Sequence, residues 1–557
     1  MPTITLQVGQ CGNQLGEELW GIFGSSCCGR YASNSSHSHQ YPYIPTGISH
    51  RGAGSLLLSG PSALQSYEDS AFFRRSSSGH RLARCVLVDT EPKVVNAVLA
   101  ADTSKFFQRS SCFLGQSGRG NNWAYGYSSN VDRIATPQTS DSSPSQPASD
   151  QGAAAIRRST SYNSSPDRRT SERGSARPSS AAPAAWRVDA HVQDPSGVEF
   201  RMIEDVFDGI RKEAEHCDTA PDFLMLHSLG GGSGSGMGSR MAEHLREEHP
   251  RNILASAAIA PGGGPGDAAM QGINSVLALS FLQAYADVIM LFSNSDWMAG
   301  NGGSGGSSGA SGTAGGGGGG AAAGVRRRSI RDMNEDIAAC IAGAVWPLSS
   351  RDACGGTSRL RDMVCNVAPD GALKMVEVRT AWVQANTPIA AIWPTAARAV
   401  ASLFPRPAAT TYPGLPRPDM SGSLLLARGF TEPHDTGVAS FIKACGGRGS
   451  FVDQDLPDCG VQLRCGTATL SHDTSPGISS KRVAGARGTP SLTAVSNRSN
   501  CISTISAAAE RVVRTVEAGA YMHWYEKYGC SRDAISYAAE QLQDVADSYR
   551  LLHGHTG

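Results

Sequence analysis

Short apolar runs alternate with amphipathic stretches through positions 1–300. The runs are bounded by turn-forming residues, which is typical of buried strands and predicts strands at Thr3–Val8, 84–88, 223–227, 253–259 and 288–292. Apolar residues spaced three or four apart predict helices at 12–23, 197–217 and 236–248. This alternation predicts the α/β class, a parallel sheet with helices on both faces. Ligands of such sheets bind beyond the carboxyl ends of the strands.

The pattern is weaker from 325 to 499, where 373–378 is the one convincing alternating strand. Nearer the C-terminus, helical spacing of apolar residues predicts a long helix over 501–528, with Gly529 as its C-cap. A second helix is expected after Ser531, whose hydroxyl would cap it. Its apolar face is formed by Ile535, Ala538, Leu542, Val545 and Tyr549.

Four segments rich in Gly, Ser, Pro and Arg interrupt the pattern, at 27–66, 128–185, 300–324 and 465–490. They contain too few large apolar residues to offset the entropy lost on ordering. We expect them to be unstructured insertions that are dispensable for folding. Arg326, Arg327 and Arg328, which follow the third insertion, are expected to be a solvated charge run.

Composition excludes several classes of function. The 557 residues contain 49 Lys+Arg and 49 Asp+Glu, so there is no overall basic field to attract nucleic acid. The 14 cysteines form no C-x-x-C pair, which argues against a zinc ribbon or a disulfide scaffold and favours free thiols in the cytoplasm. Positions 1–25 show no signal-peptide pattern. The most apolar stretch, 275–292, contains Gln283 and Asp287 and predicts a helix followed by a strand, with no membrane span.

The strongest chemical signal is a glycine-rich loop between a predicted strand and a predicted helix. Glycines without side chains let backbone N–H groups approach an anion, and the helix N-terminus adds positive potential. No Gly-Lys dipeptide occurs in the chain, so this is not a Walker A loop. The alternative is a flexible surface loop. The residues expected to bind phosphate are Gly231, Gly232, Ser233, Gly234, Ser235 and Gly236.

Three more strand-to-helix turns carry suitable chemistry. Gly9-Gln-Cys-Gly-Asn-Gln follows the first strand, and 117–123 offers backbone amides together with Asn121. Asp89 and Glu91 place two carboxylates beside the expected phosphates, which favours Mg²⁺. A helix-capping role for Asp89 is an equal alternative.

Together these loops give the chain a resemblance to the tubulin family. The motifs that match are Gly-Gln-Cys-Gly-Asn-Gln at 9–14, Gly-Gly-Gly-Ser-Gly-Ser-Gly at 230–236 and Ala-Tyr-Met-His-Trp-Tyr at 520–525. Segments 88–96 and 120–127 look most like delta-tubulin, although Gly-Asn-Asn-Trp at 120–123 is also found in gamma- and epsilon-tubulins.

The resemblance implies a GTP or GDP site with Mg²⁺. Asp89 and Glu91 serve the metal, Asn121 faces the gamma-phosphate, and the Gly-rich loop binds the alpha- and beta-phosphates. Gln271 stands where the family usually has Glu, Ser233 where it usually has Thr, and Ile330 where an aromatic side chain stacks on the base. The remaining residues implied to touch phosphate, ribose or guanine are Gln10, Cys11, Gln14, Asp267, Gln271, Asn294 and Asn334. Taken singly, Asn294 and Asn334 are better explained as helix caps.

The resemblance also implies a catalytic acid for hydrolysis in a neighbouring subunit. Counting back from Pro369, Asp362 stands where alpha-tubulin has Glu, and we expect slow GTP hydrolysis only on assembly. The alternative is that Asp362 caps a helix beginning at Met363.

The implied domains are a GTPase domain at 1–299, the Gly-rich insertion at 300–324, an intermediate α+β domain at 325–499 and C-terminal helices at 500–557. The implied function is structural, as a delta-type tubulin of the cytoplasm and cytoskeleton. It would act at centrioles or basal bodies, supporting triplet microtubules and cilium or flagellum assembly, with alpha-, beta- and epsilon-tubulin as partners. Two alternatives stay open: another minor tubulin (epsilon, or gamma with a role in nucleation), and a GTPase switch that does not polymerise because its insertions block contacts.

Overall fold

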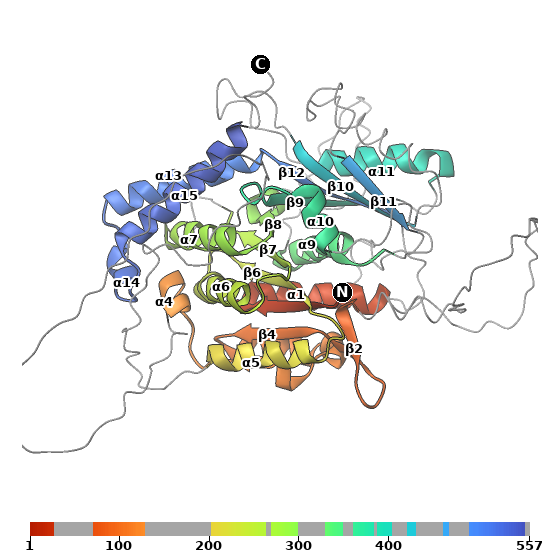
Figure 1. The fold of residues 1–557 in the computed structure, drawn as a ribbon, viewed down its shortest axis with the longest axis horizontal. Coiled ribbons are helices and arrows are strands. Elements are labelled where there is room, and N and C mark those ends of the chain that lie inside the picture. Colours follow the sequence, from red (N-terminus) through yellow and green to blue (C-terminus); the bar gives the residue numbers. More distant parts are fainter. Residues whose placement is uncertain are drawn as a thin grey trace, which may run out of the picture.

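The structure is a computed structural model that describes residues 1–26, 71–128, 202–262, 269–298, 329–348, 360–383, 387–403, 420–429, 461–466 and 490–551. Ten strands form one sheet in the order β11-β10-β12-β9-β8-β7-β6-β1-β4-β5. Figure 1 shows β9, β10 and β12 continuing the sheet from β8, β7 and β6. The strands are β1 (Thr3–Val8), β4 (Cys85–Asp89), β5 (Cys112–Leu114), β6 (Asp222–Ser228), β7 (Leu254–Ala260), β8 (Val288–Ser293), β9 (Met375–Trp382), β10 (Met420–Arg428), β11 (Val461–Gly466) and β12 (Ser491–Arg498).

The strands from β5 to β9 along this order are all parallel, as the sequence predicts. β12 is antiparallel to both β9 and β10, so the far part of the sheet is mixed. A separate hairpin pairs β2 (Phe73–Arg75) with β3 (Arg81–Ala83). Because parallel strands point the same way, the loops after β1, β4, β5, β6 and β8 meet at one edge of the sheet.

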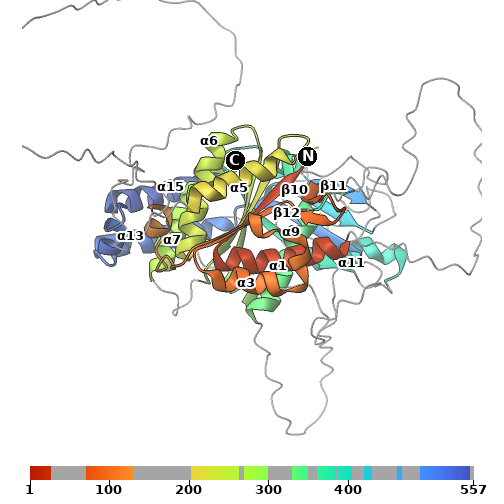
Figure 2. The same cartoon turned by 90° about the horizontal axis from the view of Figure 1, so that it is seen from below.

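Helices cover both faces of the sheet. Figure 2 shows α5 (Met202–Glu215) and α6 (Gly238–Glu248) on one side and α1 (Gly9–Ser26) and α3 (Pro92–Ala100) on the other. Alternate residues along each strand serve the two faces: Phe223 and Met225 pack with the first set of helices, and Leu224 and Leu226 with the second. The other helices are α4 (Trp123–Ser128), α7 (Ala269–Tyr285), α8 (Asn294–Met298), α9 (Ile330–Val345), α10 (Leu360–Val367), α11 (Ile389–Leu403), α13 (Cys501–Glu517), α14 (Met522–Glu526) and α15 (Arg532–Leu551).

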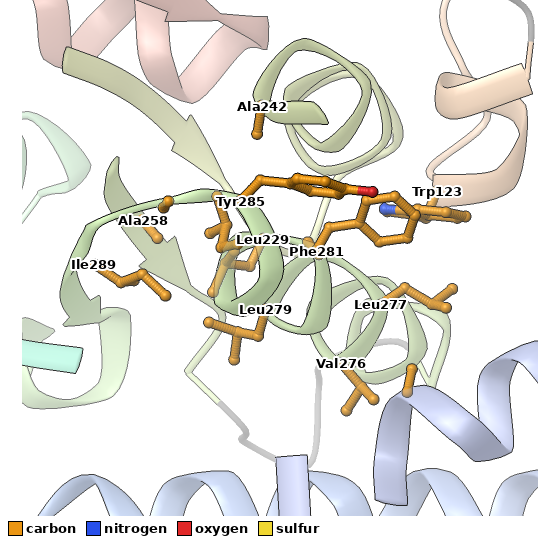
Figure 3. Close-up of a cluster of buried hydrophobic side chains, with 14 of the residues drawn as sticks. Trp123, Leu229, Ala242, Ala258, Val276, Leu277, Leu279, Phe281, Tyr285 and Ile289 are labelled. Atoms are coloured by element: carbon orange, nitrogen blue, oxygen red, sulfur yellow. The ribbon is translucent and has the colours of Figure 1, made fainter. Parts of the chain in front are cut away.

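The core beneath the strand-end loops is built around α7. Figure 3 shows Trp123, Phe281 and Tyr285 lying together beside Leu277 and Leu279. The Trp123 and Phe281 rings have centroids 5.1 Å apart, and Trp123 is completely buried. This packing fixes α4, and with it the loop that precedes it.

The prediction of one long helix over 501–528 is wrong. α13 ends at Glu517, and the chain turns at Gly519 and Tyr521, which have φ values of +64° and +66°, before the short α14. Gly529 also has a positive φ, but it follows α14. The Ser531 hydroxyl accepts a hydrogen bond from the Ala534 N–H at 3.2 Å, so the predicted cap of α15 is confirmed.

The predicted insertions lie largely outside the described residues, as do Arg326, Arg327 and Arg328. Two of the predicted boundaries are wrong: Ser128 is the last residue of α4, and Cys465 is a buried residue of β11. Residues 275–292 form the end of α7 and most of β8, as expected, and none of the described helices is suited to crossing a membrane. The nine cysteines within the described ranges are free thiols.

Candidate functional site

The loop after β6, residues 229–236 and called here the Gly-rich loop, turns directly into helix. The helical turn begins three residues before the predicted start at 236, because Ser233–Met237 form a π-helical turn that leads into α6. Gly232 has φ −72° and ψ −52°, which any residue adopts. No glycine of 230–236 has a positive φ, so none is required for a left-handed backbone, whereas Gly232, Gly234 and Gly236 permit close approach of neighbouring backbone atoms.

The neighbouring loops approach the Gly-rich loop through their backbones. A Cβ at Gly232 would lie 2.7 Å from the Arg119 carbonyl oxygen, and one at Gly9 would lie 2.9 Å from the Gly234 nitrogen. A Cβ at Gly231 would meet nothing within 4 Å. The loops after β1, β5 and β6 thus form one cradle whose backbone is open at Gly231, which fits a phosphate chain.

The turn after β4 joins this cradle through hydroxyl groups. Thr90 Oγ1 and Ser233 Oγ lie 2.5 Å apart. Asp89, buried at the end of β4, has its pKa raised to about 6 by desolvation, and Glu91 is exposed. Two carboxylates beside a phosphate cradle fit the oxygen ligands of Mg²⁺, which usually keeps waters and phosphate oxygens as its other ligands.

His227 links strand β6 to the Gly-rich loop through a hydrogen bond of its buried imidazole. It is fully buried in β6, with Nδ1 3.0 Å from the Gly234 carbonyl and Nε2 2.9 Å from Ser256 Oγ. A carbonyl only accepts, so Nδ1 carries the proton and Nε2 accepts from the serine. Desolvation lowers the pKa of His227 to about 4, which keeps this neutral tautomer in place.

The predicted residues of α1 lie at its first two turns. Gln10 is exposed at the helix start, and Cys11 and Gln14 are half-buried. Nearby, Asn13 Nδ2 donates to the carbonyls of Gly9 and Val88, at 2.9 and 3.0 Å, and so ties the start of α1 to β4. Asn13 is not among the site residues that the sequence predicts.

The residues expected to bind ribose and base come from three helices. Asn294 opens α8, whereas Asn334 is buried inside α9, so capping does not explain Asn334. Asn294 Oδ1 and Gln271 Oε1 are buried without a hydrogen-bond partner among the described residues, which fits polar contacts to a ligand. Ile330 is 63% exposed at the start of α9. Asp267 lies outside the described residues.

Asn274 is the main residue that the sequence analysis missed. It lies in α7 with no exposed surface, and its amide binds the carbonyls of Gly230 and Asn121 at 2.7 and 2.8 Å. Asn121 is thereby held with a left-handed backbone, φ +52°. The sequence gives no distinct signal for Asn274, because α7 also carries the polar residues Gln271, Ser275, Ser280 and Gln283.

Asp362 lies near the amino ends of the parallel strands, whereas the Gly-rich loop follows their carboxyl ends. α10 begins at Leu360, so the alternative of a cap for a helix beginning at Met363 is wrong, and Asp362 stands in the first turn. The adjacent Arg361 donates to the carbonyl of Arg251 at 3.2 Å, just before the amino end of β7. The Gly-rich loop follows the carboxyl end of β6, which runs parallel to β7 and spans about 20 Å. Asp362 therefore cannot reach the cradle of its own chain.

A parallel sheet whose strand-end loops form a glycine-rich cradle, in a chain without a Gly-Lys dipeptide, is typical of nucleotide-binding domains outside the Walker-type class. Residues 2–140 and 196–301 match the family model described as the Tubulin/FtsZ family, GTPase domain. The fold of this part of the chain is therefore similar to that of the GTPase domain of the tubulin/FtsZ family.

Proposed function

We propose that the chain is a GTP-binding tubulin that holds GTP or GDP with Mg²⁺ in the cradle of strand-end loops. The observation that carries this is the open backbone at Gly231 between loops that otherwise touch. Gln10, Cys11 and Gln14 lie along one side of the cradle, and the amides of Gly231–Gly236 face the alpha- and beta-phosphates. The loop of Asn121 faces the gamma-phosphate.

Mg²⁺ bound by Asp89 and Glu91 supplies positive charge that offsets the phosphate oxygens. Guanine and ribose are bound by Gln271, Asn294 and Asn334, together with Asp267. The exposed Ile330 offers a small aliphatic surface to the base in place of a stacked ring, so we expect weaker base binding by about 1 kcal/mol.

Nucleotide binding is tested on the purified chain. Acid release followed by chromatography identifies any co-purified nucleotide, and titration with GTP, GDP and ATP in Mg²⁺ gives the preference. We expect GTP and GDP to bind and ATP not to bind. A chain that holds no guanine nucleotide and binds none on titration would refute the proposal.

Within the family, we propose the delta type, working at centrioles or basal bodies to support triplet microtubules and cilium or flagellum assembly. The support is the segment Gly-Asn-Asn-Trp-Ala-Tyr-Gly-Tyr at 120–127, together with 88–96. Alpha-, beta- and epsilon-tubulin are the proposed partners. Electron microscopy of the labelled protein in flagellate cells is the test: signal confined to basal bodies is expected, and diffuse cytosolic signal favours a non-polymerising switch.

A further inference from the structure

The Asn274 side chain makes every hydrogen bond that an amide offers. Its Nδ2 donates to the carbonyls of Asn121 and Gly230. Its Oδ1 accepts from the Trp123 N–H at 2.8 Å and from the Tyr525 hydroxyl at 2.7 Å. A buried amide with two donors and two acceptors all satisfied has one orientation and holds its four partners at fixed positions.

Two of these partners belong to different phosphate-binding loops. The carbonyl of Gly230 is at the start of the Gly-rich loop, and that of Asn121 is in the loop that precedes α4. Asn274 therefore sets the spacing between the loop proposed for the gamma-phosphate and the loop proposed for the alpha- and beta-phosphates. That spacing matters to a triphosphate, which touches both loops, and much less to a diphosphate.

The fourth partner comes from the C-terminal part of the chain, 251 positions away from Asn274. Tyr525 lies in α14, is fully buried, and has its hydroxyl 3.2 Å from the Met270 carbonyl as well. Two further contacts join the same segment to the Asn121 loop and to α4, which follows it. Asn122 Nδ2 donates to the Trp524 carbonyl at 2.9 Å, and the Tyr125 and Tyr528 rings stack with centroids 4.4 Å apart. Figure 1 shows α14 beside α4.

We propose that Tyr525 and Asn274 are positioning residues for the nucleotide, and that they couple the preference for GTP over GDP to the docking of segment 521–530. The inference rests on the proposed nucleotide site. The Tyr525 hydroxyl fixes the Asn274 amide, and the amide fixes the Asn121 carbonyl against the Gly-rich loop. Coupling of binding free energies is reciprocal, so GTP bound across both loops also holds the C-terminal segment more firmly than GDP does.

Tyr525→Phe tests the inference because it removes the hydroxyl and keeps the buried ring. Tyr549→Phe is the matched control. Tyr549 is equally buried in α15, and its hydroxyl donates to Asn497 Oδ1 at 2.8 Å, while the Asn497 amide binds the carbonyls of Val367 and Leu373. The same chemistry is thus present there, away from the phosphate loops.

Affinities of GTP and GDP are measured by titration for the wild type and both variants. We expect Tyr525→Phe to weaken GTP binding about tenfold and to change GDP binding less than twofold. Tyr549→Phe is expected to leave the ratio of the two affinities unchanged. Equal ratios in all three proteins would overturn the inference while leaving the nucleotide site intact, whereas a wild type that binds neither nucleotide would overturn the proposed function as well.

Hydrogen exchange on the wild type gives a second measurement that needs no variant. Amides of Met522–Glu526 are expected to exchange several-fold more slowly with GTP than with GDP, whereas those of α15 stay the same. Equal exchange of α14 in the two nucleotide states would overturn the coupling even if Tyr525→Phe failed to fold.

Discussion

The hydroxyl oxygens of Thr90 and Ser233 lie 2.5 Å apart, which joins the turn after β4 to the Gly-rich loop. Thr90 is almost fully buried, so its hydroxyl has little access to water as an alternative partner. This hydrogen bond holds the turn that carries Asp89 and Glu91 against the Gly-rich loop without the help of a ligand.

Thr90→Val removes the hydroxyl and keeps the shape of the side chain. We expect the free energy of unfolding to fall by about 1 kcal/mol. Chemical denaturation of Thr90→Val, Ser233→Ala and the double variant measures the coupling, which should be about 0.5–1.5 kcal/mol. Strict additivity of the two single effects would contradict the bond.

Adjacent glycines of the Gly-rich loop should respond in opposite ways to alanine. In Gly232→Ala the new Cβ would lie 2.7 Å from the Arg119 oxygen and 2.8 Å from the Asn122 nitrogen, both backbone atoms that cannot yield easily. We expect a loss of stability of about 1–3 kcal/mol. Gly231→Ala fits its open position and should melt within a few degrees of the wild type.

The same pair separates folding from binding. The methyl group of Gly231→Ala projects into the space proposed for phosphate, so GTP affinity should fall while stability is retained. Thermal melts and GTP titration of the two variants check this. If Gly231→Ala binds GTP as tightly as the wild type, the phosphates do not bind next to Gly231.

His227 should make stability depend on pH. Its pKa is about 4 in the folded chain and about 6.5 when unfolded, so the unfolded state binds the proton more readily between these values. The contribution of His227 to the free energy of unfolding is therefore fully present above about pH 6.5, and it falls by about 3 kcal/mol as the pH drops to 4. Denaturation gives the free energy of unfolding of the wild type and of His227→Gln at each pH. The two values should converge as the pH falls through this range, and a constant difference between them would contradict the assignment.

Asp362→Asn tests the proposed role in assembly. Because Asp362 lies at the sheet end remote from its own cradle, the variant should bind GTP like the wild type. In co-assembly with alpha- and beta-tubulin, we expect its GTP turnover to fall about 100-fold or more, since a positioned base is lost. Equal turnover would leave Asp362 as a residue of the first turn of α10 with no catalytic role.

The parallel sheet and its strand-end loops were predictable because apolar runs and turn glycines are local signals. β1 has its predicted bounds, and β6, β7 and β8 end within a residue or so of theirs. The break after α13 was not predicted, because the apolar spacing continues through Ala520 and conceals Gly519. A left-handed Tyr521 has no sequence signature, since tyrosine rarely adopts that backbone.

Asn274 illustrates what local patterns omit from a site. Its partners lie 44, 151, 153 and 251 positions away, so only the folded chain brings them together. The glycines at 230–236 were identified by composition, but the individual roles of Gly231 and Gly232 depend on which backbone stands opposite each one.

The pairing of β8 with β9 has a mechanical consequence. Ile289 and Met290 align with Met375 and Val376, so the parallel strands from β5 to β8 and the mixed strands from β9 to β11 belong to one hydrogen-bonded sheet. Lys374 reinforces this junction by donating to the Ala286 carbonyl at 2.8 Å. If heat or denaturant unfolds one half, the adjoining strand of the other half loses its hydrogen-bonded partner. The two halves should therefore lose their structure in a single cooperative transition.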